Sequence, residues 1–218
     1  LFKETIKAAA AEYGDEEPLV IQAKSHLAQL YEDTGKLKQA LALHQQVYET
    51  DLAMLGENHP NTAGDLNNLA SVRRRLGDYQ KAENLFRQSL DVMISVLGED
   101  SPQSVSVMNN LALLLENQGL YDEAEPLFKK AHTISGKIQG ERHPTTLALL
   151  NNLAFLYESQ GDFERSELNY RKVIQLNTEV FGEAHSNTLS NQNNLAYLFL
   201  RAERFDEARP IFTKVHNL

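Results

Sequence analysis

A five-residue motif recurs along this chain at a constant interval. Its clearest form ends in Asn-Asn-Leu-Ala, and its last residue is, in successive copies, Ala28, Ala70, Ala112, Ala154 and Ala196. The interval is 42 residues each time, without insertion or deletion. Such a fixed period is typical of repeat proteins, whose units stack and bury their apolar faces against their neighbours. The sequence therefore predicts one elongated solenoid over residues 1–218.

Glycine and proline mark every repeat in the same way. Glycine recurs with the same period at Gly14, Gly56, Gly98, Gly140 and Gly182. Four residues later comes proline in the first four repeats and Ser186 in the fifth. A glycine just past a helix end stops that helix, and proline is tolerated at the first position of the next one. This punctuation predicts a segment 1–13 that ends a preceding helix, followed by repeats 14–55, 56–97, 98–139, 140–181 and a truncated 182–218.

Each repeat is predicted to contain two helices. In the second repeat, Leu66 and Leu69 lie on one stripe at helical spacing, and Gly77 then ends that helix. The following helix carries Ala82 and Phe86 on its inner stripe. A small residue recurs at the position of Ala82, which lets the two helices of a repeat approach closely. The fold class is therefore predicted to be all-α, built of helix–turn–helix repeats.

Composition excludes several classes of protein. The chain has 42% hydrophobic residues but no run of about 18 apolar ones, so we expect no membrane span. It has no cysteine, which rules out disulfides and thiol chemistry and suits a cytoplasmic protein. Its formal net charge of -9 disfavours nucleic-acid binding, which needs concentrated Lys and Arg.

The chain offers no recognisable catalytic or metal motif. Three linker histidines, His59, His143 and His185, occupy equivalent repeat positions. Helices pack roughly 8–10 Å apart, whereas zinc needs its ligands about 2 Å from one centre. We therefore expect these histidines to cap helices rather than to bind metal. Phosphate-loop, nucleophile-elbow and zinc-helix patterns are absent as well, so we expect no enzymatic activity and no cofactor.

The two ends of the sequence cut through helices. It begins at Leu1 without a methionine, and its last repeat stops part-way through a second helix. An interrupted solenoid exposes apolar surface that a neighbouring repeat or cap normally covers. We therefore expect more chain on at least one side, or self-association through these ends.

The repeat resembles a known family. The segment Leu55-Gly56-Glu57-Asn58-His59-Pro60-Asn61-Thr62 followed by Asn-Asn-Leu-Ala, and the Gly-x-Tyr-x-x-Ala-Glu-x-x-Phe pattern after it, are similar to the tetratricopeptide repeat (TPR) of kinesin-light-chain type. The resemblance covers essentially the whole chain. It implies a right-handed superhelical solenoid that acts as a scaffold or cargo adaptor. It also implies that the first helix of each repeat lines a concave binding groove.

Paired asparagines on the first helices are the leading candidates for partner binding. Asparagine is a mediocre helix former, yet two stand side by side in four repeats: Asn67 and Asn68, Asn109 and Asn110, Asn151 and Asn152, Asn193 and Asn194. A side-chain amide both donates to and accepts from a peptide backbone. A rung every ~10 Å would meet about every third residue of an extended ligand. The alternative is that one or both series bond between neighbouring helices and only lock the solenoid.

Apolar and basic residues add two further candidates. Leu113, Phe155 and Tyr197 share one repeat position that faces away from their helix's inner stripe, so they are candidate pockets for apolar anchors. Packing against the next first helix is the alternative. Arg74 and Arg75 belong to the one basic triplet and are predicted to hold a ligand carboxylate. A solvated helix end that favours the helix dipole is the alternative for them.

The function predicted from these features is a protein-interaction scaffold. Its partner is expected to be an extended protein segment with apolar and acidic residues, and neither nucleic acid nor membrane. Two alternatives stay open: a structural or oligomerising solenoid, and the sensor arm of a larger multidomain protein.

Overall fold

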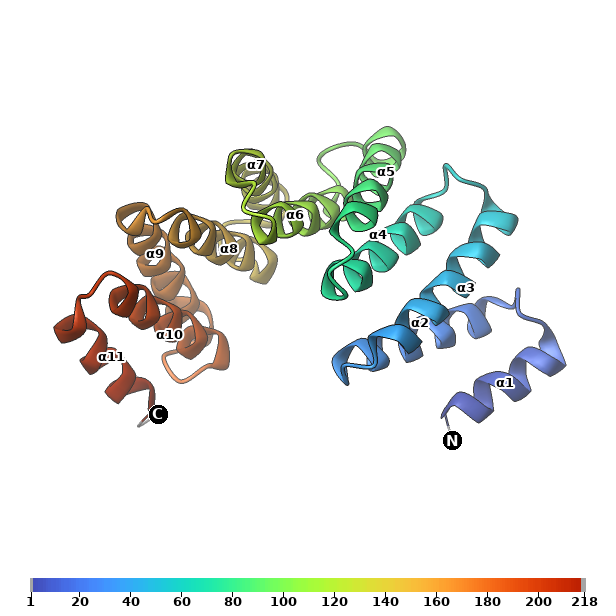
Figure 1. Cartoon of the computed structure of the whole chain (residues 1–218), viewed down its shortest axis with the longest axis horizontal. Coiled ribbons are helices and arrows are strands. Elements are labelled where there is room, and N and C mark those ends of the chain that lie inside the picture. The colour runs from blue at the N-terminus through green and yellow to red at the C-terminus, as the bar shows by residue number, and fades with distance from the viewer. Residues whose placement is uncertain (1, 217–218) are drawn as a thin grey trace. The chain divides into compact units, whose positions relative to one another are not determined.

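A computed structural model describes residues 2–216, which form helices and short connections and no strand. The helices, shown in Figure 1, are α1 (Phe2–Tyr13), α2 (Pro18–Asp33), α3 (Leu37–Leu55), α4 (Pro60–Arg75), α5 (Tyr79–Leu97), α6 (Pro102–Asn117), α7 (Tyr121–Gln139), α8 (Pro144–Gln160), α9 (Phe163–Phe181), α10 (Ser186–Arg201) and α11 (Phe205–His216). The all-α prediction is confirmed.

The helices pack in consecutive pairs. We call the first helix of each repeat the A helix (α2, α4, α6, α8 and α10) and the second the B helix. A helices pack on their own B helices, as α4 does on α5, and a B helix also packs on the next A helix, as α9 does on α10. The chain divides into two compact units, Leu1–Leu114 and Leu115–Leu218, and the boundary falls within α6. Each unit is described by itself below.

Linker histidines cap three A helices. The Nδ1 atoms of His59, His143 and His185 accept hydrogen bonds of 3.1, 3.2 and 3.2 Å from backbone N–H groups two residues later. Each N–H would otherwise lack a partner at the start of its helix. Ser101 does the same for α6, because its Oγ accepts from the Ser104 N–H at 3.1 Å. The capping role expected for the three histidines is confirmed.

Left-handed residues end the helices as predicted. Gly56 has φ +85° and Gly161 has φ +81°, both in the region that side chains disfavour. The last repeat has Glu203 in place of the glycine that follows the other A helices, and this residue keeps φ +59°. The turn geometry therefore persists without glycine.

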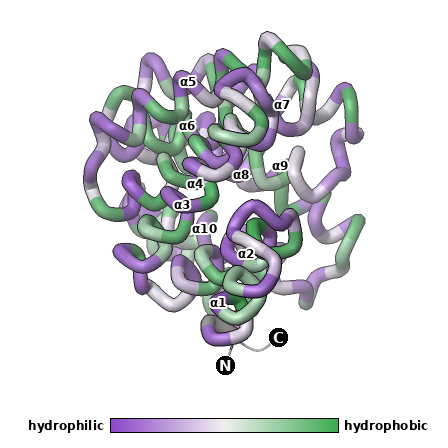
Figure 2. Tube along the Cα trace, turned by 90° about the vertical axis from the view of Figure 1, so that its right-hand side faces the viewer, coloured by the Kyte–Doolittle hydropathy of each residue, from purple (hydrophilic) through white to green (hydrophobic). Residues whose placement is uncertain are grey.

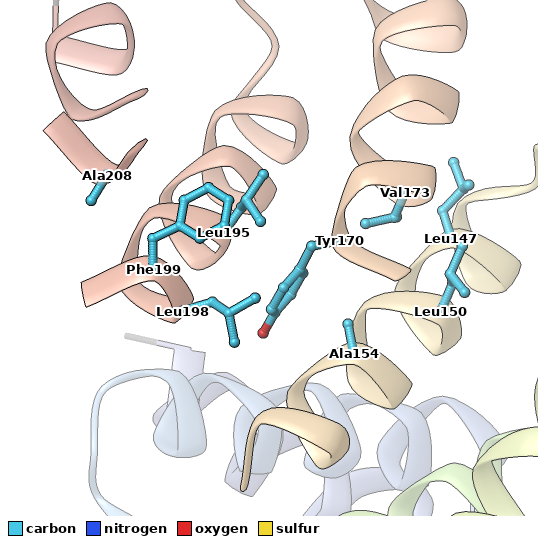
Figure 3. Packing of buried hydrophobic residues seen from close by; sticks show 9 residues of the cluster. All are labelled: Leu147, Leu150, Ala154, Tyr170, Val173, Leu195, Leu198, Phe199 and Ala208. Carbon is cyan, nitrogen blue, oxygen red and sulfur yellow. The ribbon is translucent and has the colours of Figure 1, made fainter. Parts of the chain in front are cut away.

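The core of each unit consists of the inner stripes of A and B helices. Figure 3 shows one such cluster in the second unit, where Tyr170 and Val173 of α9 lie between residues of α8 and α10. At the position where the sequence predicts a small residue, Ala82, Ala124 and Ser166 are all fully buried. Figure 2 shows polar and apolar residues alternating along the helices. No helix of the described residues is long and apolar enough to cross a membrane.

Candidate protein-interaction site

The predicted asparagines join successive A helices. In the first unit, Asn110 Nδ2 donates a 2.9 Å hydrogen bond to Asn67 Oδ1. In the second, Asn194 Nδ2 donates to Asn151 Oδ1 at 3.1 Å. The first asparagine of one repeat thus accepts from the second asparagine of the next. We call these four residues the asparagine ladder.

The eight predicted asparagines are all half-buried. Asn109 Nδ2 lies 3.4 Å from Asn110 Oδ1, at the long end of a hydrogen bond, and Asn68 lines a separate pocket described below. Asn152 and Asn193 lie beside Asn151 and Asn194 on the same A helices. The side chains are partly covered and partly open to solvent, which suits both bonding between helices and contact with a ligand.

Asn151 has a further partner that sequence reasoning missed. Its Oδ1 also accepts a 2.7 Å bond from Asn191, which in turn accepts a 2.6 Å bond from Asn177 of α9. This polar chain ties one B helix and two A helices together. Aligning the repeats could have revealed this pair. Asn177 and Asn191 are both polar, whereas the residues 42 positions earlier are Ser135 and the apolar Leu149.

A second set of contacts lies two helical turns further along the A helices. Glu116 Oε1 accepts a 2.8 Å bond from Ser159, and Glu158 Oε1 accepts a 2.9 Å bond from Arg201. In the first unit, Arg75 donates to Glu32 Oε2 at 3.2 Å and to the Glu32 carbonyl at 2.8 Å. Arg75 therefore already holds a carboxylate of its own chain. Arg74, its neighbour, is half-buried.

Two buried carboxylates of this second set also contact aromatic side chains of B helices. Tyr170 donates to Glu158 Oε2 at 3.1 Å, and His44 Nε2 lies 2.9 Å from Glu32 Oε1. Burial and the nearby Glu158 charge raise the pKa of the Tyr170 hydroxyl well above its usual range, so this group stays protonated and donating. Glu158 is thus fixed between Tyr170 and Arg201.

Apolar side chains of α8 and α10 form a pocket beside Glu158. We call it the aromatic pocket; its volume is about 460 Å³, and its lining residues are Phe155, Glu158, Tyr170, Asn194, Tyr197, Leu200 and Arg201. Phe155 and Tyr197 are 44% and 58% exposed, although they are large hydrophobic residues. Tyr197 also makes an edge-to-face contact with Phe212, with ring centroids 5.3 Å apart.

Three of the predicted site residues meet in this pocket: Phe155, Asn194 and Tyr197. Leu113, the third member of the predicted apolar series, is half-buried in the first unit. Leu200 and Arg201 were not predicted as site residues. Arg201 occupies the same repeat position as Arg75, so the period carried the signal that could have found it.

The described residues contain no group of three or more His, Asp or Glu side chains arranged to hold a metal ion. The polar groups of the aromatic pocket are one carboxylate, one guanidinium, one amide and two hydroxyls. This donor set suits hydrogen bonding and ion pairing with a ligand.

Sequence profiles agree with the geometry. The tetratricopeptide-repeat profile matches residues 20–95, 63–135, 103–176 and 145–218. Among curated proteins, none matches the sequence.

Solved structures with the same fold include proteins of kinesin-light-chain type. BtubC (BKLC) from P. vanneervenii is 20% identical with a TM-score of 0.80, over 99% of this chain and 90% of that one. The nearly identical TPR-like repeats of a Podosopora anserina protein described as a kinesin light chain are 23% identical with a TM-score of 0.78, over 90% and 93%. A Rap protein complexed with Competence and Sporulation Factor is 14% identical with a TM-score of 0.76, over 90% of this chain and 53% of that one. With profile matches that together span residues 20–218, this chain belongs to the tetratricopeptide repeat family, as its repeat pattern predicted.

Proposed function

We propose that this TPR chain is a protein-interaction scaffold that binds an extended segment of a partner on its A helices, with the aromatic pocket as the main anchor site. TPR arrays generally serve as scaffolds between proteins and are generally not enzymes. The observation that carries the proposal is the pair of exposed aromatic side chains, Phe155 and Tyr197, next to polar groups at fixed positions. Exposed aromatic residues in a pocket are typical of interface hot spots.

The pocket's chemistry favours a segment with an apolar and an acidic residue. Phe155, Tyr197 and Leu200 offer apolar surface for an anchor side chain. The Arg201 side chain is half exposed, and its bond to Glu158 uses one of the five N–H donors of a guanidinium. The remaining donors suit a carboxylate of the partner. A Rap protein of similar fold was solved with Competence and Sporulation Factor bound, which supports a ligand-binding role for such repeats.

The asparagine ladder serves two roles in this proposal. One bond from each donor amide joins neighbouring A helices. An amide has two N–H donors, so the second donor of Asn110 and of Asn194 is left for a peptide backbone. We propose that Asn67, Asn68, Asn109, Asn110, Asn151, Asn152, Asn193 and Asn194 present such groups, with Leu113, Arg74 and Arg75 at the edges. We also propose a cytoplasmic location, which the absence of cysteine suits.

Peptide display against the whole chain tests this function. Peptides selected on the wild-type protein are measured against Phe155→Ser and Tyr197→Ser, and against Leu168→Ser as a matched control. Leu168 is a 70% exposed apolar residue on α9, outside the aromatic pocket. We expect each pocket substitution to weaken binding at least about tenfold, the size of a moderate hot spot, and the control to leave it unchanged.

Two results would contradict the proposal. One is the selection of peptides that bind all three variants as tightly as the wild type. The other is a failure to select any peptide while sedimentation shows concentration-dependent self-association, which would favour an oligomerising role.

A further inference from the structure

Two aspartates face each other between α3 and α4. Asp51 and Asp65 are each only 7% exposed, and both line the same pocket. The equivalent pairs in the later repeats are uncharged: Met93 with Val107, Ser135 with Leu149, and Asn177 with Asn191. Acidic residues at these two positions are therefore not needed for the repeat to fold.

The pair has hydrogen-bonding capacity that its surroundings do not use. Asp65 Oδ2 is buried without a hydrogen-bond partner. Burial, followed by the nearby charge of Asp51, raises the pKa of Asp65 to about 8. An acid pair of this kind holds a proton at neutral pH because two adjacent buried carboxylates repel each other.

The two aspartates line a pocket of about 670 Å³ in the first unit. We call it the acid pocket. Its wall includes the exposed apolar residues Leu19, Met54 and Leu55. The lining also includes Gln22 and Ser25 of α2, Met93 of α5 and Gln103 of α6, and all lining residues except the two aspartates are uncharged. Negative charge in this pocket thus has no basic side chain to balance it.

We propose that the acid pocket binds a single ammonium or guanidinium group on an apolar stem, the chemistry of a lysine or arginine side chain. The apolar wall suits the methylene stem of such a side chain, and the carboxyl pair suits its charged head. That the cation comes from a partner segment rests on the function proposed above; the affinity of the pocket for the cation does not. A calcium or magnesium ion fits less well, because it takes six or more oxygen ligands and this pocket is largely apolar.

Cation binding is coupled to proton release. An opposite charge beside the pair favours its fully ionised form and expels the shared proton. Binding is therefore weaker where the proton is held tightly and stronger as pH rises toward and beyond 8. No basic or acidic group other than Asp51 and Asp65 lines the pocket among the described residues, so this pair dominates its pH response.

The test uses a small cation alone, so its result does not depend on whether any peptide binds the chain. The whole 218-residue protein is titrated with n-butylammonium chloride, with n-butanol as the neutral match, and amide shifts are followed by NMR. We expect saturable shifts around Asp65, Asn68 and Met54 with the ammonium salt only. Affinity is expected to rise at least about fivefold from pH 6 to pH 9, because the ionised fraction of the pair grows over that range.

The variant Asp51→Asn with Asp65→Asn provides the decisive comparison. It recreates the neutral pair that this fold already accommodates at Asn177 and Asn191, where the two amides are 2.6 Å apart. We expect its affinity for n-butylammonium to fall at least about tenfold. Equal binding by this variant, equal shifts with n-butanol, or a pH-independent affinity of the wild type would each overturn the proposal. The last two results need no variant.

Discussion

The side-chain amide of Asn110 donates a 2.9 Å hydrogen bond to the side-chain oxygen of Asn67, which belongs to the preceding repeat. Asn194 and Asn151 repeat this relationship in the second unit at 3.1 Å. Each pair links two A helices through groups that are half-buried, where a hydrogen bond is shielded from part of the competing water. Asparagine is therefore retained in helices that would otherwise favour better helix formers.

A double-mutant cycle on Asn67→Ala and Asn110→Ala measures this contact. We expect each single substitution to lower the free energy of unfolding by about 1 kcal/mol, the usual net contribution of one hydrogen bond. The two should couple by about 0.5–1.5 kcal/mol, as residues in direct contact do. Urea denaturation gives the four stabilities. Strict additivity of the two substitutions would show that the bond contributes nothing.

The sequence determined the architecture because the architecture is periodic. The linker glycines and prolines recur four or five times, and so does the small residue at the position of Ala82. A pattern repeated that often is not a chance match, so it predicts the helix boundaries reliably. The structure has helices where this pattern predicts them. The recurring asparagines could be predicted as candidate links between neighbouring A helices for the same reason, but the observed bonds join residues 43 apart and not equivalent ones.

The partner of Arg75 could not be predicted in that way. Its carboxylate, Glu32, lies 43 residues earlier, one residue off the 42-residue period. The same offset joins Arg201 to Glu158 and Ser159 to Glu116. It arises from how neighbouring A helices pack, and a single sequence does not specify that register. From the sequence, charge alone makes Arg75 a candidate partner of a ligand carboxylate, whereas in the structure it binds Glu32.

Removing the Tyr170 hydroxyl tests its hydrogen bond to Glu158. Tyr170→Phe leaves Glu158 Oε2 without its 3.1 Å donor while the carboxylate stays buried. We expect a loss of about 1–3 kcal/mol in unfolding free energy, the cost of an unsatisfied buried polar group. Phenylalanine itself fits this position, because Phe86 and Phe128 occupy it in two other repeats.

Tyr157→Phe is the matched control for that substitution. The Tyr157 hydroxyl donates to Glu125 at 3.1 Å, but Glu125 also pairs with Lys129 and Arg165. We expect this variant to lose less than about 0.5 kcal/mol, as solvent and the two cations still satisfy the carboxylate. Equal losses in the two variants would mean that the burial of Glu158 does not matter. Both are measured by urea denaturation.

Substitutions at a linker histidine test the helix caps. His143→Ala removes the acceptor of the Thr145 N–H and should cost about 1 kcal/mol, a typical value for a lost N-cap. His143→Ser should restore the stability, because Ser101 caps α6 at the equivalent position. Thermal melts of the three proteins give the comparison. If the serine variant were as unstable as the alanine variant, the histidine would act through packing and not through capping.

The pH dependence of stability tests the Asp51–Asp65 pair without any ligand. The pKa of Asp65 is about 8 in the folded chain, against about 3.9 for an ordinary aspartate in an unfolded one. Between these values the folded chain holds a proton that the unfolded chain has released. Stability from this group is therefore fully present below about pH 4 and is lost as pH rises through about 8.

Asp65→Asn removes this titration and keeps a donor toward Asp51, as Asn177 does toward Asn191. We expect the variant to match the wild type near pH 4 and to exceed its unfolding free energy by about 1–3 kcal/mol near pH 8, since it relieves an unfavourable buried acid pair. Urea denaturation of both proteins across this range isolates the effect of the pair, because groups away from Asp51 and Asp65 titrate alike in the two chains. The opposite trend, or parallel stability curves from pH 4 to pH 9, would mean that Asp65 is ionised at neutral pH. The pair would then be solvated rather than sharing a proton, and the acid pocket would carry its full negative charge before any cation arrives.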